Sequence, residues 1–390
     1  MFSARLHWDL QPNSISKLLA VKRAAGIGIL DLTESNPSHA GLAMPADAIV
    51  AAFADPAILR YSPDSAGLRS AREAVAAYYG DVDSEQILLT TSTSEAYSFL
   101  FKLLTDPGDE VLVPQPSYPL FDFLAGLELV RVVRYPLVYH GDWEIDFEAL
   151  TARVGPKTRA LVLVNPNNPT GSFLKRHQLD ALVDLCRERQ IAIISDEVFA
   201  DYAFGEDPRL VHSLRFCDSV LTFCLSGLSK VVGLPQMKLG WMVVSGPQAL
   251  RAEAFTRLEL IADTYLSVGT PVQVAAPKLL AAGRAVRQQI RDRTARNLAA
   301  LRATLPDDSP LRVLNVEAGW YAILEIPRVR SEEEWTLRLL EHYNVLVQPG
   351  FFYDFESEGF LVVSLLTPET AFDQGTKAIV GAAGHAGFGV

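Results

Sequence analysis

Short apolar runs that alternate with longer amphipathic segments constrain this chain more than any other feature. Runs that are apolar on both faces predict buried strands, and the segments between them follow a helical period. The predicted strands lie at 86–90, 110–113, 129–133, 160–164, 191–195, 220–225 and 240–244, and the predicted helices include 94–104, 118–126 and 175–189. Strand–helix alternation of this kind predicts an α/β fold with a mostly parallel sheet that helices cover on both faces.

The two ends of the chain differ from the middle. A long helical stretch rich in Arg and Ala covers 250–304. Three strand patterns follow it, at 311–326, 345–347 and 360–366. These strands predict a smaller α+β unit, which the N-terminal segment is expected to join. We therefore expect a large domain over 48–285 and a composite small domain made of 1–47 with 286–390.

Charge and cysteine usage exclude several classes of protein. The 35 Lys and Arg residues are outnumbered by 46 Asp and Glu residues, so the net charge is −11. An anionic chain without a basic run is a poor binder of nucleic acid or of an anionic membrane. Three cysteines without a paired motif predict neither a disulfide framework nor a metal site. The absence of a signal-peptide pattern and of an apolar stretch of ~20 residues predicts a cytoplasmic protein.

Ligands of open α/β sheets bind beyond the carboxyl ends of the strands, so the residues that follow each predicted strand matter most. The strand at 86–90 is followed by Thr91 and by Ser92-x-x-Glu95, which fits a capping box at a helix start. Hydroxyls and free N–H groups at that positive helix end favour a phosphate. Taken alone, a plain N-cap is the commoner explanation.

Three further strand ends carry polar residues. The strand at 160–164 precedes Asn165-Pro166-Asn167-Asn168-Pro169-Thr170-Gly171, a rigid turn or an ordinary polar loop. Asp196 ends a buried strand, where a carboxylate is costly unless a cation pairs with it, although an N-cap is the alternative. Lys230 lies in an apolar loop that would lower its pKa for Schiff-base chemistry, unless it simply reaches solvent.

The four strand ends together describe one ligand. It carries a phosphate, a ring cation and an aldehyde that a lysine can attack. Pyridoxal phosphate has these features.

The sequence then resembles the fold-type I pyridoxal-phosphate enzymes, specifically the class I/II aminotransferases, from about residue 31 to 375. The resemblance rests on motifs that occur in the family's order. They are Tyr61-x5-Gly67, Pro107-Gly108-Asp109-Glu110-Val111, Pro116-x-Tyr118-Pro119, Asn167-Asn168-Pro169-Thr170-Gly171, Ser195-Asp196-Glu197, Ser229-Lys230 and Lys238-x-Gly240-Trp241.

The resemblance implies a role for each matching residue. Lys230 resembles the lysine that forms the Schiff base and shuttles the proton. Asp196 resembles the carboxylate that keeps the pyridine nitrogen protonated. Asn168 resembles the donor to the ring's 3-oxygen, and Tyr118 resembles the aromatic residue that stacks on the ring.

The phosphate contacts are implied in the same way. Ser92, Thr93 and Ser94 resemble the phosphate cradle, and Tyr61 resembles the residue that reaches the phosphate of a neighbouring subunit, which implies a homodimer. Gly227 occupies the place of a family serine, so Ser226 or Ser229 is expected to serve instead. Lys238 replaces an arginine, which keeps a point charge without the bidentate fork.

Other departures from the family concern the ring and the substrate. Phe199 stands where the family commonly has a tyrosine that bonds the 3-oxygen, and Tyr202 is a candidate substitute. Val362 stands where the family's arginine binds the substrate carboxylate. Asn36, in Ser35-Asn36-Pro37, resembles the loop that closes over substrate. Asn36 and Val362 are therefore the expected substrate contacts.

The function that the resemblance implies is a ping-pong aminotransferase acting on an amino acid and a 2-oxo acid. The missing arginine keeps a β-lyase (C–S lyase) or a decarboxylase open as alternatives. A cofactor-binding regulator would need a DNA-binding segment, and residues 1–30 are too short and too weakly basic for one. A nicotinamide enzyme lacks its strand–GxGxxG–helix context, and a serine hydrolase lacks a GxSxG elbow.

Overall fold

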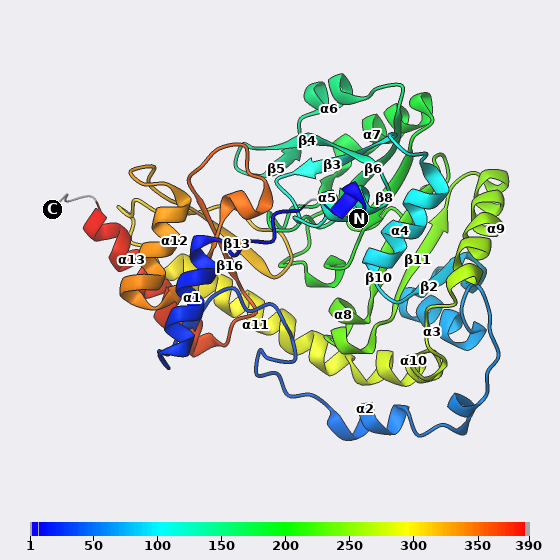
Figure 1. Cartoon of the computed structure of the whole chain (residues 1–390), viewed down its shortest axis with the longest axis horizontal. Coiled ribbons are helices and arrows are strands. Elements are labelled where there is room, and N and C mark those ends of the chain that lie inside the picture. The colour runs from blue at the N-terminus through cyan, green and yellow to red at the C-terminus, as the bar shows by residue number, and fades with distance from the viewer. Residues whose placement is uncertain (1, 7, 387–390) are drawn as a thin grey trace.

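An eight-stranded sheet forms the centre of the computed structural model, which describes residues 2–6 and 8–386 (Figure 1). Five adjacent strands run parallel, whereas β11 is antiparallel to both of its neighbours and β5 is antiparallel to β4. In sheet order the strands are β2 (Ile87–Thr90), β11 (Gly240–Ser245), β10 (Thr222–Gly227), β8 (Ala192–Asp196), β6 (Thr158–Val164), β3 (Glu110–Gln115), β4 (Arg131–Tyr139) and β5 (Trp143–Ile145). The predicted α/β architecture is confirmed.

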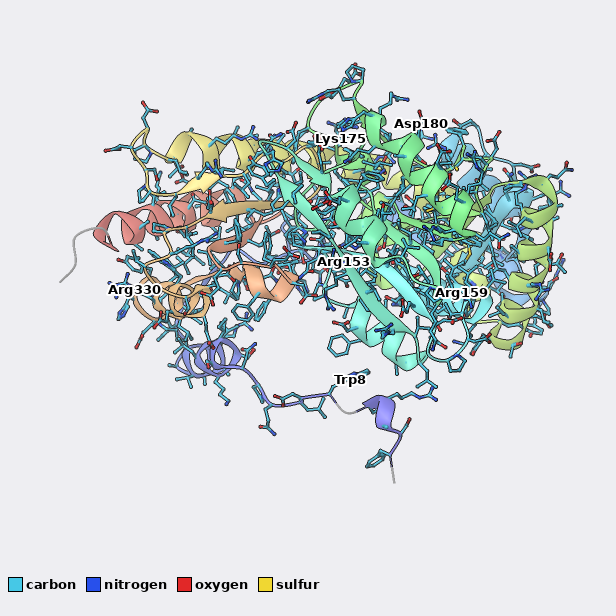
Figure 2. All side chains as sticks on the ribbon, turned by 90° about the horizontal axis from the view of Figure 1, so that it is seen from above. Trp8, Arg153, Arg159, Lys175, Asp180 and Arg330 are labelled. Atoms are coloured by element: carbon cyan, nitrogen blue, oxygen red, sulfur yellow. The ribbon has the colours of Figure 1, made fainter. Side chains whose placement is uncertain are left out.

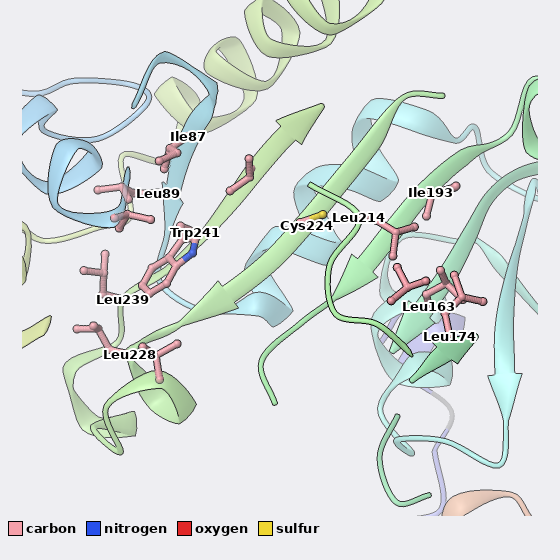
Figure 3. Packing of buried hydrophobic residues seen from close by; sticks show 14 of the residues in the cluster. Ile87, Leu89, Leu163, Leu174, Ile193, Leu214, Cys224, Leu228, Leu239 and Trp241 are labelled. Carbon is pink, nitrogen blue, oxygen red and sulfur yellow. The ribbon is translucent and has the colours of Figure 1, made fainter. Parts of the chain in front are cut away.

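Helices cover both faces of this sheet because its strands are apolar on both faces. In β6, Leu161 and Leu163 belong to one buried cluster, while Val162 and Val164 belong to the other. The first cluster packs under α3 (Arg69–Tyr79), α7 (Arg176–Arg189) and α10 (Thr270–Ala282), and the second under α4 (Thr93–Leu104), α5 (Phe121–Leu127) and α9 (Gln248–Tyr265). Figure 3 shows part of the first cluster, with Trp241 beside Leu89.

A smaller four-stranded antiparallel sheet lies to one side of the large sheet, on the left in Figure 1. Its strands, in order, are β12 (Arg312–Val313), β13 (Tyr321–Glu325), β16 (Phe360–Ser364) and β15 (Gln348–Pro349). The N-terminal segment joins this unit, since β1 (Leu30–Asp31) pairs with β14 (Val345–Leu346) and α1 (Ser14–Ala24) packs on α12 (Glu332–Tyr343). The exact boundaries of the two domains stay a prediction.

The remaining elements connect these units. The helical stretch predicted at 250–304 is three helices, because the chain turns at Leu266 and again at Gly283, where a Cβ would lie 2.1 Å from Val232. The last of them, α11 (Arg284–Thr304), runs from α10 to α13 (Glu369–Ala386). The others are α2 (Ala46–Ala52), α6 (Phe147–Arg153), α8 (Leu228–Val231), β7 (Leu174–Lys175) and β9 (Leu210–Val211). Within residues 2–6 and 8–386, no helix combines the length and apolarity needed to cross a bilayer.

Among the contacts that tie the larger sheet to the smaller unit, two lie on opposite sides of the molecule. The N-terminal arm, which carries Trp8 in Figure 2, lies along α5: Trp8 packs edge-on against Phe123 at 4.9 Å and Arg5 donates to the Leu127 carbonyl. On the opposite side, Lys175 of β7 forms an ion pair with Glu317, which precedes β13. Lys175 is 1% exposed and also donates to the Phe173 carbonyl.

The Lys175–Glu317 pair gives a stability prediction. Glu317→Ala leaves a buried ammonium without its anion, so the free energy of unfolding should fall by about 3 kcal/mol or more. The double variant Lys175→Met/Glu317→Leu removes both charges and should recover most of that loss. Guanidinium titration of the three proteins measures the difference, and equal losses in the single and double variants would contradict it.

Candidate active site

A cavity of about 320 Å³ lies between the two units, at the carboxyl ends of β6, β8 and β10. Most of its wall comes from the larger sheet and its loops, while Ser35 and Tyr321 come from the smaller unit. The predicted site residues that line it are Ser92, Thr93, Ser94, Tyr118, Asn168, Asp196, Ser229, Lys230 and Lys238. Residues from five separate stretches of the sequence therefore meet at one place, as the strand-end argument requires.

Lys230 projects from α8, directly after β10. Burial lowers the pKa of its amine to about 8, and the nearby Asp196 carboxylate opposes that change. The Lys230 Nζ lies 4.5 Å from the ring centroid of Trp320 and 5.3 Å from that of Phe199. The backbone of Lys230 is also held, because the Tyr202 hydroxyl donates to its carbonyl. A lysine with an amine near pKa 8 is a usable nucleophile at neutral pH.

Asp196 is the last residue of β8 and is buried. Its Oδ1 accepts from the Val198 N–H at 3.3 Å and its Oδ2 accepts from the Tyr97 hydroxyl at 3.2 Å. Burial raises the pKa of this carboxyl to about 6, while both hydrogen bonds act to lower it. No ion pair of Asp196 with a Lys or Arg lies within 4.0 Å among the described residues, so the carboxylate is available to a cationic ligand.

The start of α4 forms an anion cradle. Ser92 is its N-cap, with Oγ accepting from the Glu95 N–H at 3.2 Å. The Glu95 side chain accepts from the Thr91 N–H at 2.7 Å, one residue before the N–H expected of a capping box. Gly240 lets β11 pass beneath this helix start, since a Cβ there would lie 3.1 Å from the Ser92 carbonyl carbon. Lys238, which is exposed, and Ser229 line the same cavity as this helix start.

The loop after β6 contains three asparagines, of which two form hydrogen bonds to the protein through their side chains and the third does not. Asn165 bonds Val211 and Leu174, and Asn167 bonds Pro116, Ser117 and Thr170. The buried Asn168 Oδ1 has no hydrogen-bond partner in the described part of the chain. No hydrogen bond joins the Asn168 side chain to another described residue, so its amide is available to a ligand.

These residues fit pyridoxal phosphate, the cofactor that the resemblance implies. The cavity offers an amine for its aldehyde, a carboxylate for its ring nitrogen, an unpartnered amide and a cradle for its phosphate. Tyr118, which is 40% exposed, adds an aromatic wall. The amine, the carboxylate, the N–H of the amide and the cradle each match one feature of that molecule.

Four predicted residues lie outside the cavity wall. Ser226 is buried in β10, and Tyr61 is 78% exposed on the surface. The Asn36 side chain accepts from the Ser38 N–H, and its neighbour Ser35 lines the cavity. Val362 is fully buried in the apolar cluster that includes Tyr321 and Trp320. Their roles stay predictions.

Two further expectations can be compared with the structure. Tyr202, the candidate substitute for the tyrosine missing at Phe199, uses its hydroxyl on the Lys230 carbonyl. Sequence reasoning missed Tyr97, which lines the cavity together with Tyr321. Helical spacing offered a signal for Tyr97, because it follows Thr93 by four residues on the same face. Tyr321 lies in a strand of the other unit, and the aromatic pair Trp320-Tyr321 indicates either an apolar side of the pocket or, as sequence reasoning preferred, core packing.

Comparison with known proteins gives three findings. A family model described as Aminotransferase class I and II matches residues 27–375. Glutamate-pyruvate aminotransferase AlaA of Escherichia coli is 31% identical over 256 residues, which cover 64% of this chain and 63% of that protein. An S-alkyl-thiohydroximate lyase of Arabidopsis thaliana is 30% identical over 227 residues, which cover 56% of this chain and 49% of that protein. The match thus spans less than two thirds of the length of these curated relatives.

A solved structure shares the fold over almost the whole chain. An aminotransferase from Escherichia coli aligns with a TM-score of 0.86 at 24% identity, covering 98% of both chains. The two-unit architecture is therefore that of a known enzyme fold.

The position of Lys230 gives a titration prediction. Only a neutral amine reacts with an acylating reagent, so labelling of Lys230 should rise with pH through a midpoint near 8. Asp196→Asn removes the carboxylate that raises the pKa of Lys230, so the midpoint should move to lower pH. Competitive acetylation of the cofactor-free protein followed by peptide mass spectrometry measures both midpoints. A midpoint unchanged by Asp196→Asn would contradict the electrostatic link.

Proposed function

Because the chain belongs to the aminotransferase class I and II family, whose members use pyridoxal phosphate, we propose that it is an aminotransferase that moves an amino group between an amino acid and a 2-oxo acid. One observation carries the proposal. The Lys230 amine, with its pKa lowered by burial, shares a cavity with the buried Asp196 carboxylate and the anion cradle. A ping-pong order follows, in which the amino group is first taken from the donor and then given to the acceptor.

Each cavity residue has a proposed task. When bound, pyridoxal phosphate supplies an aldehyde and an electron-withdrawing ring that stabilises negative charge next to the substrate nitrogen. Lys230 Nζ would hold the cofactor and move the proton at the substrate carbon. The Asp196 carboxylate would favour a protonated ring nitrogen, because each charge stabilises the other. Asn168 would bond the 3-oxygen, and Tyr118 would cover the ring face.

The proposed phosphate contacts combine neutral and charged groups. Ser92, Thr93 and Ser94 would bond the phosphate at the positive end of α4. Ser229 and Lys238 line the same end of the cavity, and Lys238 supplies a point charge. We retain Ser226 as a proposed member because it lies in β10, two residues before α8 begins.

The substrate end of the cavity is mainly uncharged. Ser35 and Tyr321 line it, and Val362 belongs to the same buried apolar cluster as Tyr321. We propose Asn36 and Val362 as residues that shape this end, Asn36 through its loop and Val362 through the packing of Tyr321. The similarity to a relative that is named a glutamate-pyruvate aminotransferase supports the proposal that the substrates are an amino acid and a 2-oxo acid.

We also propose a homodimer and a cytoplasmic location. Tyr61 lies on the exposed surface, away from the cavity of its own chain. An exposed tyrosine in a family-specific position is supportive of a contact with the phosphate of a second chain.

A lyase is the second candidate, because one relative is named an S-alkyl-thiohydroximate lyase. A C–S lyase would use the same amine and carboxylate but would release a thiol and ammonia without an amino acceptor. It is therefore distinguished by its independence of a 2-oxo acid.

The aminotransferase proposal predicts a defined spectroscopic and kinetic behaviour. Protein reconstituted with pyridoxal phosphate should be yellow, and an amino donor should shift the visible band until a 2-oxo acid restores it. Lys230→Ala should lower turnover roughly a thousandfold while cofactor still binds noncovalently. Substantial turnover by Lys230→Ala would refute its role. Pyruvate and ammonia formed from a cysteine conjugate without any 2-oxo acid would instead support the lyase.

The dimer proposal has its own test. Sedimentation equilibrium should give a particle of two chains, and Tyr61→Phe should weaken cofactor binding roughly tenfold through loss of one hydrogen bond to a charged group. The same substitution at Tyr265, which is also exposed, serves as the control. A monomer with full cofactor affinity would exclude a shared site.

A further inference from the structure

Tyr97 is a cavity residue to which neither the motifs nor the family markers assign a role. It lies on α4, is 2% exposed, and its hydroxyl donates to Asp196 Oδ2 at 3.2 Å. Its ring packs against Phe101 at 6.0 Å and edge-on against Phe121 at 5.6 Å. The side chain therefore crosses the space between the helix of the anion cradle and the carboxylate at the end of β8.

The hydrogen bonds of Asp196 leave it little orientational freedom. Oδ1 is held by the Val198 N–H and Oδ2 by Tyr97, so the carboxylate is fixed by one backbone and one side-chain donor. A donor to a carboxylate also stabilises its charged form. This matters because burial and the neighbouring Glu197 both favour the neutral form of Asp196, whereas only Lys230 opposes them by charge.

Tyr97 also connects the two ends of the cavity. Four residues before it on the same helical face is Thr93, in the first turn of α4, which forms the cradle. A ligand anion that settles on this turn therefore contacts the helix that carries the donor to Asp196. The carboxylate and the cradle are linked through one rigid element of 12 residues.

We propose, on the basis of the proposed function, that Tyr97 is a positioning residue that keeps the Asp196 carboxylate ionised and oriented for a cationic ring nitrogen while α4 holds the phosphate of the same ligand. It does not touch the reacting atoms and acts through Asp196. Its loss is expected to weaken recognition of the ring nitrogen specifically, not the binding of the phosphate.

The test uses two probes on the full-length, cofactor-free protein. The first is 4-deoxypyridoxine 5′-phosphate, which has no aldehyde and therefore forms no bond with Lys230. The second is the same molecule with carbon in place of the ring nitrogen. Tyr97→Phe keeps the aromatic packing and removes only the hydroxyl. Tyr135→Phe is the matched control, since Tyr135 is fully buried and donates to the Val162 carbonyl outside the cavity wall.

Tyr97→Phe should weaken binding of the nitrogen-containing probe about tenfold in calorimetry, which corresponds to a shift of about one pKa unit in the carboxylate. Binding of the carbon analogue should change less than about twofold, and Tyr135→Phe should leave both affinities unchanged. In an Asp196→Asn background, Tyr97→Phe should have no further effect, because the partner of the hydroxyl is then neutral.

The pH dependence supplies an independent readout. Affinity for the nitrogen-containing probe should fall on acidification as Asp196 takes up a proton, with a midpoint near 6 in the absence of ligand. Removing the Tyr97 donor raises the pKa of Asp196, so this fall should occur at higher pH than in Tyr135→Phe. The phosphate of the probe titrates equally in both proteins and cancels in the comparison.

Two outcomes would overturn the inference. Equal weakening of both probes by Tyr97→Phe would show that Tyr97 merely supports the fold of α4, and unchanged affinity for both would show that its hydrogen bond is dispensable. Wild-type protein that binds neither probe nor pyridoxal phosphate would instead refute the proposed function itself. The first two results leave that function intact, so the two failures are distinguishable.

Discussion

A buried carboxylate at the end of a central strand is the constraint on which this site depends. Asp196 has lost most of its hydration, and the nearby Lys230 is the opposite charge that acts on it. Burial moves the pKa values of the two groups toward each other, that of the acid upward and that of the base downward. Such a pair is poised for a ligand that carries a positive ring and reacts with an amine.

The surroundings of Lys230 show how aromatic packing shapes this pair. Trp320 and Phe199 place ring faces near the amine, while Tyr202 holds the backbone behind it. Two rings favour a charged ammonium, whereas their exclusion of water favours the neutral amine. The lowered pKa of Lys230 indicates that desolvation is the larger effect.

Residues of both structural units form the part of the cavity that is proposed to bind substrate. Ser35 and Tyr321 reach the cavity from the smaller unit, and Lys175 with Glu317 and the N-terminal arm bind that unit to the larger sheet. Val362 of β16 is buried with Tyr321 in one apolar cluster, so packing and not a fixed positive charge occupies this position. The shape of the cavity therefore depends on how the two units are held together.

The amino-acid sequence by itself predicted the α/β class and the strand ends that carry Asp196 and Lys230, because apolar runs and turn-forming residues act locally, whereas Asn168 was singled out by the family resemblance. It placed the start of β4 two residues early, since Leu129 takes a left-handed conformation that completes the turn after α5, and it ended the strand at 133 although β4 continues to Tyr139. Only the tertiary structure decided that Tyr97 bonds Asp196 and that Tyr321 lines the cavity. Both contacts join residues about a hundred or more positions apart, and such pairings depend on how sheets and helices pack, which no local periodicity records.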